Sequence, residues 1–197
     1  MDFEKLVSAK EKELIQDNFT HLRIHYNSIE YREKIKNYAN KYGLNEEDII
    51  NGIKENDIIA SFFCKDPSKQ NFTEKLVSEI LGVKTLPQSG KNCIRFDSKG
   101  NIHSFKKVDS SKSVDFLINN IYITQKYTRG TGGAQDNQYN DVVDFLVKGS
   151  KQHKCAAILD GSFWANKRKE LIHYFKDNCN VRILSMNDII NGGFNFE

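Results

Sequence analysis

Two short apolar segments separated by Asn119-Asn120 limit the fold more than any other feature of residues 112–127. Asparagine tolerates the left-handed backbone conformation that a two-residue hairpin turn requires, so the pair predicts a β-hairpin with Ile118 opposite Ile121. Side chains alternate between the two faces of a strand. One face of this hairpin is therefore apolar and is expected to be the core: Val114, Phe116, Ile118, Ile121 and Ile123.

The other face of the hairpin is polar. The same register places Asp115 opposite Thr124 and makes Lys126 a diagonal cross-strand neighbour of Asp115. An exposed cross-strand ion pair contributes less than about 1 kcal/mol, and an ordinary surface ion pair is one interpretation. The other is that the second face carries chemistry.

The segment after the hairpin favours the chemical interpretation. Residues 134–147 have helical periodicity, and one helix face changes from amides to apolar side chains: Gln135, Gln138, Tyr139, Val142 and Leu146. The first turn of a helix also favours a phosphate. The preceding glycine-rich connector brings Arg129 to the same end, although it matches neither common nucleotide-binding fingerprint.

Periodicity and turn signals organise the rest of the chain. Helices are expected at 3–18, 28–42, 45–55, 73–81, 134–147, 166–175 and from about 186, and strands at 92–97, 101–106, 113–127, 156–159 and 181–184. Pro67 marks the boundary between a helical region, 1–65, and a second region, 66–197. This order predicts an α/β (α+β) fold in which helices flank a mixed central β-sheet, with a helical N-terminal extension.

Charge is distributed unevenly over the 197 residues, whose net charge is +3. Residues 1–60 hold 9 Lys and Arg against 12 Asp and Glu, whereas the stretch from Lys84 to Lys112 holds seven basic and two acidic residues. A basic segment of this kind suits a polyanion, and a solvated lysine-rich face is the alternative.

Cysteine spacing and hydropathy exclude several classes of protein. The four cysteines are scattered and include no C-x-x-C pair, so neither a disulfide framework nor a zinc site is expected. No run of about 18 apolar residues occurs, and the N-terminus lacks the apolar segment of a signal peptide. We expect a soluble cytoplasmic protein with reduced thiols and no membrane association.

Taken together, these motifs resemble the PD-(D/E)xK nuclease superfamily, and within it the type II restriction endonucleases. The family pattern is an aspartate on one strand, acid-x-lysine on the next, and a helix on either side. Here Ser113-Val114-Asp115 is similar to the first element and Thr124-Gln125-Lys126 to the second. Gln135 and Tyr139 have the Q-x-x-x-Y spacing of one branch of the superfamily. The resemblance covers about residues 70–193 and implies a restriction-endonuclease-like core.

The resemblance also implies roles for individual residues. Asp115 would hold Mg²⁺ together with the backbone carbonyl of Gln125, and Lys126 would act on the attacking water. One departure is Thr124, which stands where the family has its second acid; its hydroxyl is a poorer ligand for a hard cation. Glu74, or alternatively Glu79, would supply that charge from the upstream helix.

The implied function is Mg²⁺-dependent, sequence-specific cleavage of double-stranded DNA. Contacts to DNA are expected from Arg129, Gln135, Gln138, Lys91 and Lys112. Cutting both strands of a symmetric site calls for a homodimer, and a cognate DNA methyltransferase is the expected genetic partner. Two alternatives remain: a structure-specific or repair nuclease of the same fold, and a non-catalytic DNA-binding protein on the nuclease scaffold.

Overall fold

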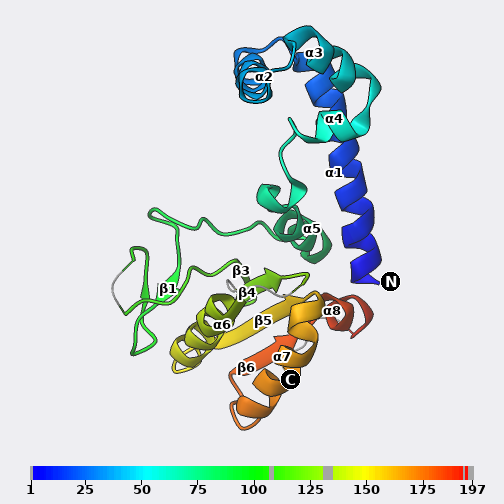
Figure 1. Cartoon of the computed structure of the whole chain (residues 1–197). Coiled ribbons are helices and arrows are strands. Elements are labelled where there is room, and N and C mark those ends of the chain that lie inside the picture. Colours follow the sequence, from blue (N-terminus) through cyan, green and yellow to red (C-terminus); the bar gives the residue numbers. More distant parts are fainter. Residues whose placement is uncertain (1, 107–108, 131–134, 193, 195–197) are drawn as a thin grey trace. The chain divides into compact units, whose positions relative to one another are not determined.

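Figure 1 shows the computed structural model of the chain, which describes residues 2–106, 109–130, 135–192 and 194. The chain divides into two compact units. One unit is Lys5–Phe72, and the other comprises Met1–Glu4 and Thr73–Glu197.

The first unit is helical. Its elements are α1 (Phe3–His25, whose first two residues belong to the other unit), α2 (Ile29–Tyr42), α3 (Glu46–Glu55), α4 (Asp57–Ser61) and a 3₁₀ turn, Pro67–Gln70. The three helices expected here are present, and α1 continues to His25 rather than ending near residue 18. Asn45 begins α3 because its side chain accepts a hydrogen bond from the Glu47 amide at 2.7 Å. Leu22, Ile35 and Ile53 are fully buried in its core.

The second unit is a mixed α/β structure. Its elements are α5 (Phe72–Leu81), β1 (Arg95–Phe96), β2 (Ile102–His103), β3 (Phe116–Ile118), β4 (Ile121–Tyr127), α6 (Gln135–Gly149), β5 (Lys154–Asp160), α7 (Ser162–Tyr174), β6 (Val181–Leu184) and α8 (Met186–Gly192). A four-stranded sheet has the order β3-β4-β5-β6, and β1 and β2 form a separate two-stranded ribbon. The β3–β4 pair is antiparallel, whereas β4–β5 and β5–β6 are parallel. The expected mixed sheet flanked by helices is confirmed.

The hairpin has the register expected from its turn. Ile118 pairs with Ile121, and Phe116 pairs with Ile123. Asn119 and Asn120 both adopt the left-handed conformation, with φ of 48° and 62°. The Asp115 amide donates to the Ile123 carbonyl at 2.8 Å, which continues the ladder one residue before β3.

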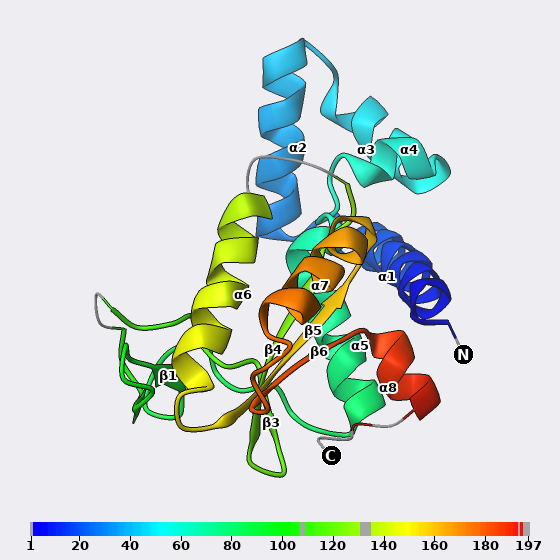
Figure 2. The same ribbon diagram turned by 90° about the horizontal axis from the view of Figure 1, so that it is seen from below.

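Both faces of the sheet are covered, so the expectation that only the apolar face of the hairpin is core was wrong. Thr124 on the polar face is aligned with Ala157 of β5 and is only 2% exposed. Ala157 packs with apolar side chains of α6 and α7, among them Val142, Phe145, Leu146 and Leu171. Figure 2 shows α6 on one side of the strands and α5 and α8 on the other. The reason is topological, because a parallel pair such as β4–β5 needs a crossover helix that packs on the sheet.

Gly161 allows the turn from β5 into α7. Its φ is +93°, and a Cβ atom at this position would lie 2.3 Å from the Thr128 carbonyl oxygen. The Thr128 amide in turn donates to the Asp160 carbonyl at 3.0 Å. The close approach of these two segments therefore requires glycine.

We predict that Gly161→Ala lowers the free energy of unfolding by about 3 kcal/mol or more, because strain and a backbone clash add together. Gly82→Ala is the matched control, since Gly82 has φ +66° but no atom within 4 Å of the added Cβ. Only the left-handed backbone penalty of about 1 kcal/mol applies there. Urea unfolding of both variants measures the difference, and equal losses would contradict the role given to the Thr128 contact.

Candidate functional site

The Asp115 carboxylate is the centre of the candidate site. One oxygen, Oδ2, accepts hydrogen bonds from Thr124 Oγ1 at 3.1 Å, from the Gln125 amide at 2.7 Å and from Lys126 Nζ at 3.3 Å. The other oxygen, Oδ1, accepts one from Gln88 Nε2 at 3.1 Å. The side chain is only 7% exposed. A carboxylate can remain buried as an anion when several donors face it in this way.

A loop preceding β1 holds Asp115 from the side opposite β4. The Leu86 amide donates to the Asp115 carbonyl at 2.8 Å. Gln88 is fixed in turn, because its side-chain oxygen accepts a hydrogen bond from Ser113 Oγ and its backbone carbonyl accepts one from Arg95 Nη2 at 3.0 Å. Sequence reasoning missed Gln88 as a partner of Asp115. A single glutamine in a loop carries no periodic or spacing signal.

Lys126 contacts both the carboxylate and the backbone of the site. Its Nζ atom lies 3.3 Å from Asp115 Oδ2 and 2.9 Å from the Gln125 carbonyl oxygen. Its side chain is 26% exposed, more than that of Asp115. The ammonium is thus the more accessible group of the pair and can reach an anion in solvent.

Glu74 of α5 belongs to the same constellation. It is partly buried, and this burial raises the pKa of its carboxyl group, as does the nearby Asp115 carboxylate, while the Lys126 ammonium acts in the opposite direction. Glu79 lies further along α5 and is exposed. Of the two acids considered from the sequence, the structure brings Glu74 within electrostatic reach of Asp115 and Lys126.

Thr124 and Gln125 have different surroundings. The Thr124 hydroxyl donates a hydrogen bond to the Asp115 carboxylate and so orients it. In the family pattern, a second acid would stand at the position of Thr124. The Gln125 side chain lies on the other face of β4 and is buried, and its Nε2 atom has no hydrogen-bond partner among the described residues. The backbone amide and carbonyl of Gln125 are the groups that contact the site.

Asp115, Glu74 and Gln125 offer oxygen atoms of the kind that a hard divalent cation binds. Asp115 and Glu74 provide two carboxylates, and Gln125 provides a carbonyl. Within the described ranges, no group of three or more His, Cys, Asp and Glu side chains is arranged to hold a metal. Mg²⁺ does not need such a group, because it commonly binds one or two carboxylates and keeps several water ligands.

The residues expected to bind DNA lie in three places. Gln135 Nε2 donates to the Gly130 carbonyl at 2.6 Å, and Gln138 Oε1 accepts from Thr128 Oγ1 at 2.8 Å, so both contact the residues that directly follow β4. Arg129 stacks on the Tyr127 ring at 5.4 Å and lies 4.0 Å from Glu4.

The two expected lysines are separate from that loop. Lys112 Nζ is 3.6 Å from Asp141 Oδ2, and its side chain is 59% exposed. Lys91 lines a groove together with Arg95 and Lys106. The structure therefore brings Asp115, Lys126, Thr124, Gln125 and Glu74 together. The five residues expected to contact DNA lie elsewhere, two of them on α6.

A second buried carboxylate, Asp160, lies at the end of β5. Both of its oxygens accept from the Met186 amide, at 3.2 and 3.1 Å, so Asp160 caps the start of α8. Burial raises the pKa of Asp160 from 3.8 to about 6, although the Met186 hydrogen bond acts in the opposite direction. Trp164, in the first turn of α7, is fully buried. The capping role of Asp160 was missed.

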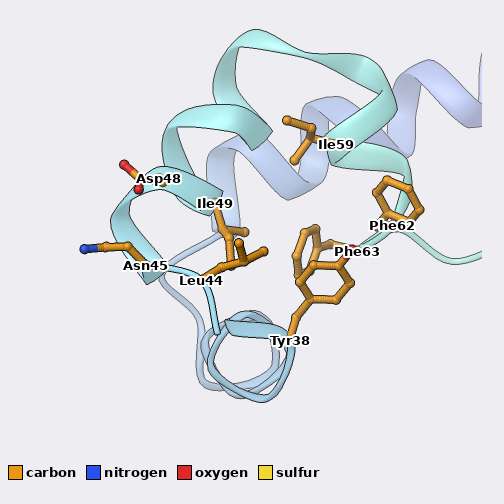
Figure 3. A pocket seen from close by; sticks show the side chains of 8 residues that line it. All are labelled: Tyr38, Leu44, Asn45, Asp48, Ile49, Ile59, Phe62 and Phe63. Atoms are coloured by element: carbon orange, nitrogen blue, oxygen red, sulfur yellow. The ribbon is translucent and has the colours of Figure 1, made fainter. Parts of the chain in front are cut away.

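A pocket of about 240 Å³ in the helical unit has a different character. Figure 3 shows Tyr38, Ile59, Phe62 and Phe63 around it, with the polar ends of Asn45 and Asp48 directed outwards. Its interior is apolar and does not pair an acid with a cation.

No family model, curated protein or solved structure matches the chain. In the part of the chain that the structure describes, no helix combines the length and the apolar character needed to cross a membrane. The function is therefore inferred from the site itself.

Asp160 leads to a prediction about pH. Because its folded-state pKa of about 6 is above the ordinary value of 3.8, the native state binds the proton more tightly. The contribution of Asp160 to stability is full below about pH 4 and is lost as the pH rises through about 6, a change of about 3 kcal/mol. We predict that Asp160→Asn, which cannot ionise, removes this decline.

Urea unfolding at several pH values between 4 and 7 measures this effect as the difference in the free energy of unfolding between wild type and Asp160→Asn. Asp97→Asn is the control, because hydrogen bonds from Asn101 lower the pKa of Asp97 to about 2. The stability contributed by Asp97 is present above its unfolded-state pKa and is lost only as the pH falls towards 2. A wild-type curve parallel to that of Asp160→Asn would show that Asp160 does not titrate in this window.

Proposed function

We propose that the protein is a Mg²⁺-dependent DNA endonuclease of the type II restriction class. The observation that carries the proposal is the contact between the Asp115 carboxylate and the Lys126 ammonium, on adjacent hairpin strands and within reach of Glu74. A nuclease needs oxygen ligands for a hard cation and a cation beside the attacked phosphate. These side chains supply both, in the order expected for a PD-(D/E)xK core.

The roles of the residues follow from their contacts. Asp115, Glu74 and the Gln125 carbonyl would hold Mg²⁺, which when bound supplies Lewis-acid polarisation of the scissile phosphate. Lys126 Nζ, the more exposed group, orients the attacking water through a hydrogen bond and offsets negative charge that develops on the phosphate. Thr124 Oγ1 holds Asp115 in position.

Glu74 can replace the acid that the family pattern has at the position of Thr124. Thr124 is neutral, so a second negative charge has to come from another element. Burial, and after it the Asp115 carboxylate, raise the pKa of Glu74, and a divalent cation held by both carboxylates would favour their ionised forms. Metal binding at this site would accordingly release a proton from any Glu74 that is protonated.

The proposed substrate is double-stranded DNA, cleaved by a cytoplasmic homodimer whose host carries a cognate methyltransferase. Incubation with phage DNA and Mg²⁺ distinguishes this function from its alternatives. Discrete fragments indicate a restriction enzyme, a smear indicates a structure-specific or repair nuclease, and a gel shift without cleavage indicates a non-catalytic binding protein.

We predict that Asp115→Asn and Lys126→Ala each lower Mg²⁺-dependent cleavage by at least about 100-fold, because one removes metal-binding charge and the other removes the cation beside the phosphate. Circular dichroism and a DNA gel shift in EDTA test whether folding and binding are retained. Full cleavage by either folded variant would refute the assignment of the site.

We also predict that Glu74→Gln raises the Mg²⁺ concentration for half-maximal cleavage by about 10-fold or more, because a ligand charge is lost. Glu79→Gln is the matched control on the same helix, since Glu79 is exposed. A titration of cleavage rate against Mg²⁺ measures both. The same Mg²⁺ dependence of the cleavage rate in both variants would show that Glu74 is not a metal ligand.

A further inference from the structure

A basic groove lies beside the candidate site. It has a volume of about 430 Å³ and is lined by Ser89, Lys91, Arg95, Ser104, Phe105 and Lys106, with Gly90. Three of these residues are cations, and none of the lining residues is an acid. A concave surface with one sign of charge concentrates oppositely charged ligands, so the groove suits an anion.

Arg95 connects the groove to the catalytic carboxylate. Its Nη1 donates to the Ser111 carbonyl at 3.0 Å, and its Nη2 donates to the Gln88 carbonyl at 3.0 Å. The Gln88 side chain donates in turn to Asp115. One residue therefore separates the guanidinium in the groove from the carboxylate at the site.

Phe105 gives the groove an exposed aromatic surface. Its side chain is a large apolar group, yet the residue is 64% exposed. His103 fixes the loop, because its Nδ1 atom lies 2.7 Å from the Phe105 carbonyl oxygen and its ring centroid lies 5.7 Å from that of Phe105. The ring is thus presented beside three cations on a held backbone.

This combination favours one kind of ligand. Simple anions use the cations but do not need an aromatic surface, and an apolar peptide does not need three cations. A nucleotide uses both, because its base stacks on an aromatic ring and its phosphates meet lysine and arginine. In a regular duplex the base faces are covered by their neighbours, so only an unpaired or extruded nucleotide can stack on Phe105.

We propose that the groove binds an unpaired nucleotide of the DNA strand, with its base on Phe105 and its phosphates at Lys91, Arg95 and Lys106. That this strand is the one cleaved at Asp115 rests on the proposed function; the binding itself does not. A volume of about 430 Å³ is at the small end of ligand sites, which suits one nucleotide rather than a longer segment. In a double-stranded substrate, the bound nucleotide would be one that leaves the base stack, and a bulge or a single-stranded position lowers the cost of exposing it.

The test is equilibrium binding in EDTA, measured by fluorescence anisotropy with the full chain. Three probes share one sequence: a single strand of about 12 nucleotides, the blunt duplex, and the duplex with a one-nucleotide bulge. We expect Phe105→Ala to weaken binding of the single strand and the bulged duplex by about 10-fold or more and that of the blunt duplex by less than about 2-fold. Phe105→Trp should retain wild-type preference.

Ile102→Ala is the matched control. Ile102 belongs to the adjacent strand β2, is 44% exposed and is not among the residues that line the groove. The proposal is overturned if Phe105→Ala behaves like Ile102→Ala, or if it weakens all three probes equally. Lys91→Ala should reduce the slope of log K against log salt concentration for single-strand binding by about one unit. An unchanged slope would show that Lys91 does not contact a phosphate.

The outcome is separable from that of the proposed function. Binding in EDTA requires no cleavage, so an inactive protein that prefers unpaired DNA would support the groove and contradict the nuclease. An active nuclease whose DNA binding does not depend on Phe105 would support the proposed function and contradict the groove.

Discussion

The placement of the Asp115 carboxylate in a nearly buried position is the strictest constraint on the second unit. Removing such a group from water costs several kcal/mol unless donors replace the water. Four donors do so here: a hydroxyl, a backbone amide and an ammonium from β4, and the Gln88 amide. A slip of one residue in the β3–β4 register would turn Asp115 away from these groups. The apolar pairs of the hairpin and its two left-handed asparagines therefore protect the site as well as the fold.

Local signals predicted much of this structure. The hairpin register follows from strand alternation and a two-residue turn, and the start of α3 follows from an asparagine cap, so neighbouring residues determine both. The contacts that were missed join distant segments: Gln88 meets Asp115 across 27 positions, and Asp160 meets Met186 across 26. Alternation also could not reveal that Thr124 is buried, since this depends on α6 crossing over the sheet rather than on the hairpin itself.

The charge balance of the proposed site is distributed over three elements. β4 contributes a cation, the segment before β3 contributes one acid, and α5 contributes the other. Two carboxylates with one ammonium leave a negative excess when both acids are ionised. Burial, and after it the Asp115 carboxylate, raise the pKa of Glu74, and a further cation would offset both effects. Thr124 limits the problem, because a third acid beside Asp115 would be more costly still. A neutral residue at that position is thus compatible with a site that binds one cation.

Gln88 links the groove to the site, because its carbonyl accepts from Arg95 and its side chain donates to Asp115. The presence of arginine at position 95 therefore affects how the groove and the site act together. A guanidinium has five N–H donors, and two hydrogen bonds to the Ser111 and Gln88 carbonyls leave capacity for a phosphate. Arg95 can therefore contact DNA without releasing the loop that orients Asp115. A lysine has three donors on one nitrogen and a flexible stem, so a phosphate would compete with both carbonyls. In the proposed complex, DNA binding in the groove consequently preserves the geometry of the carboxylate.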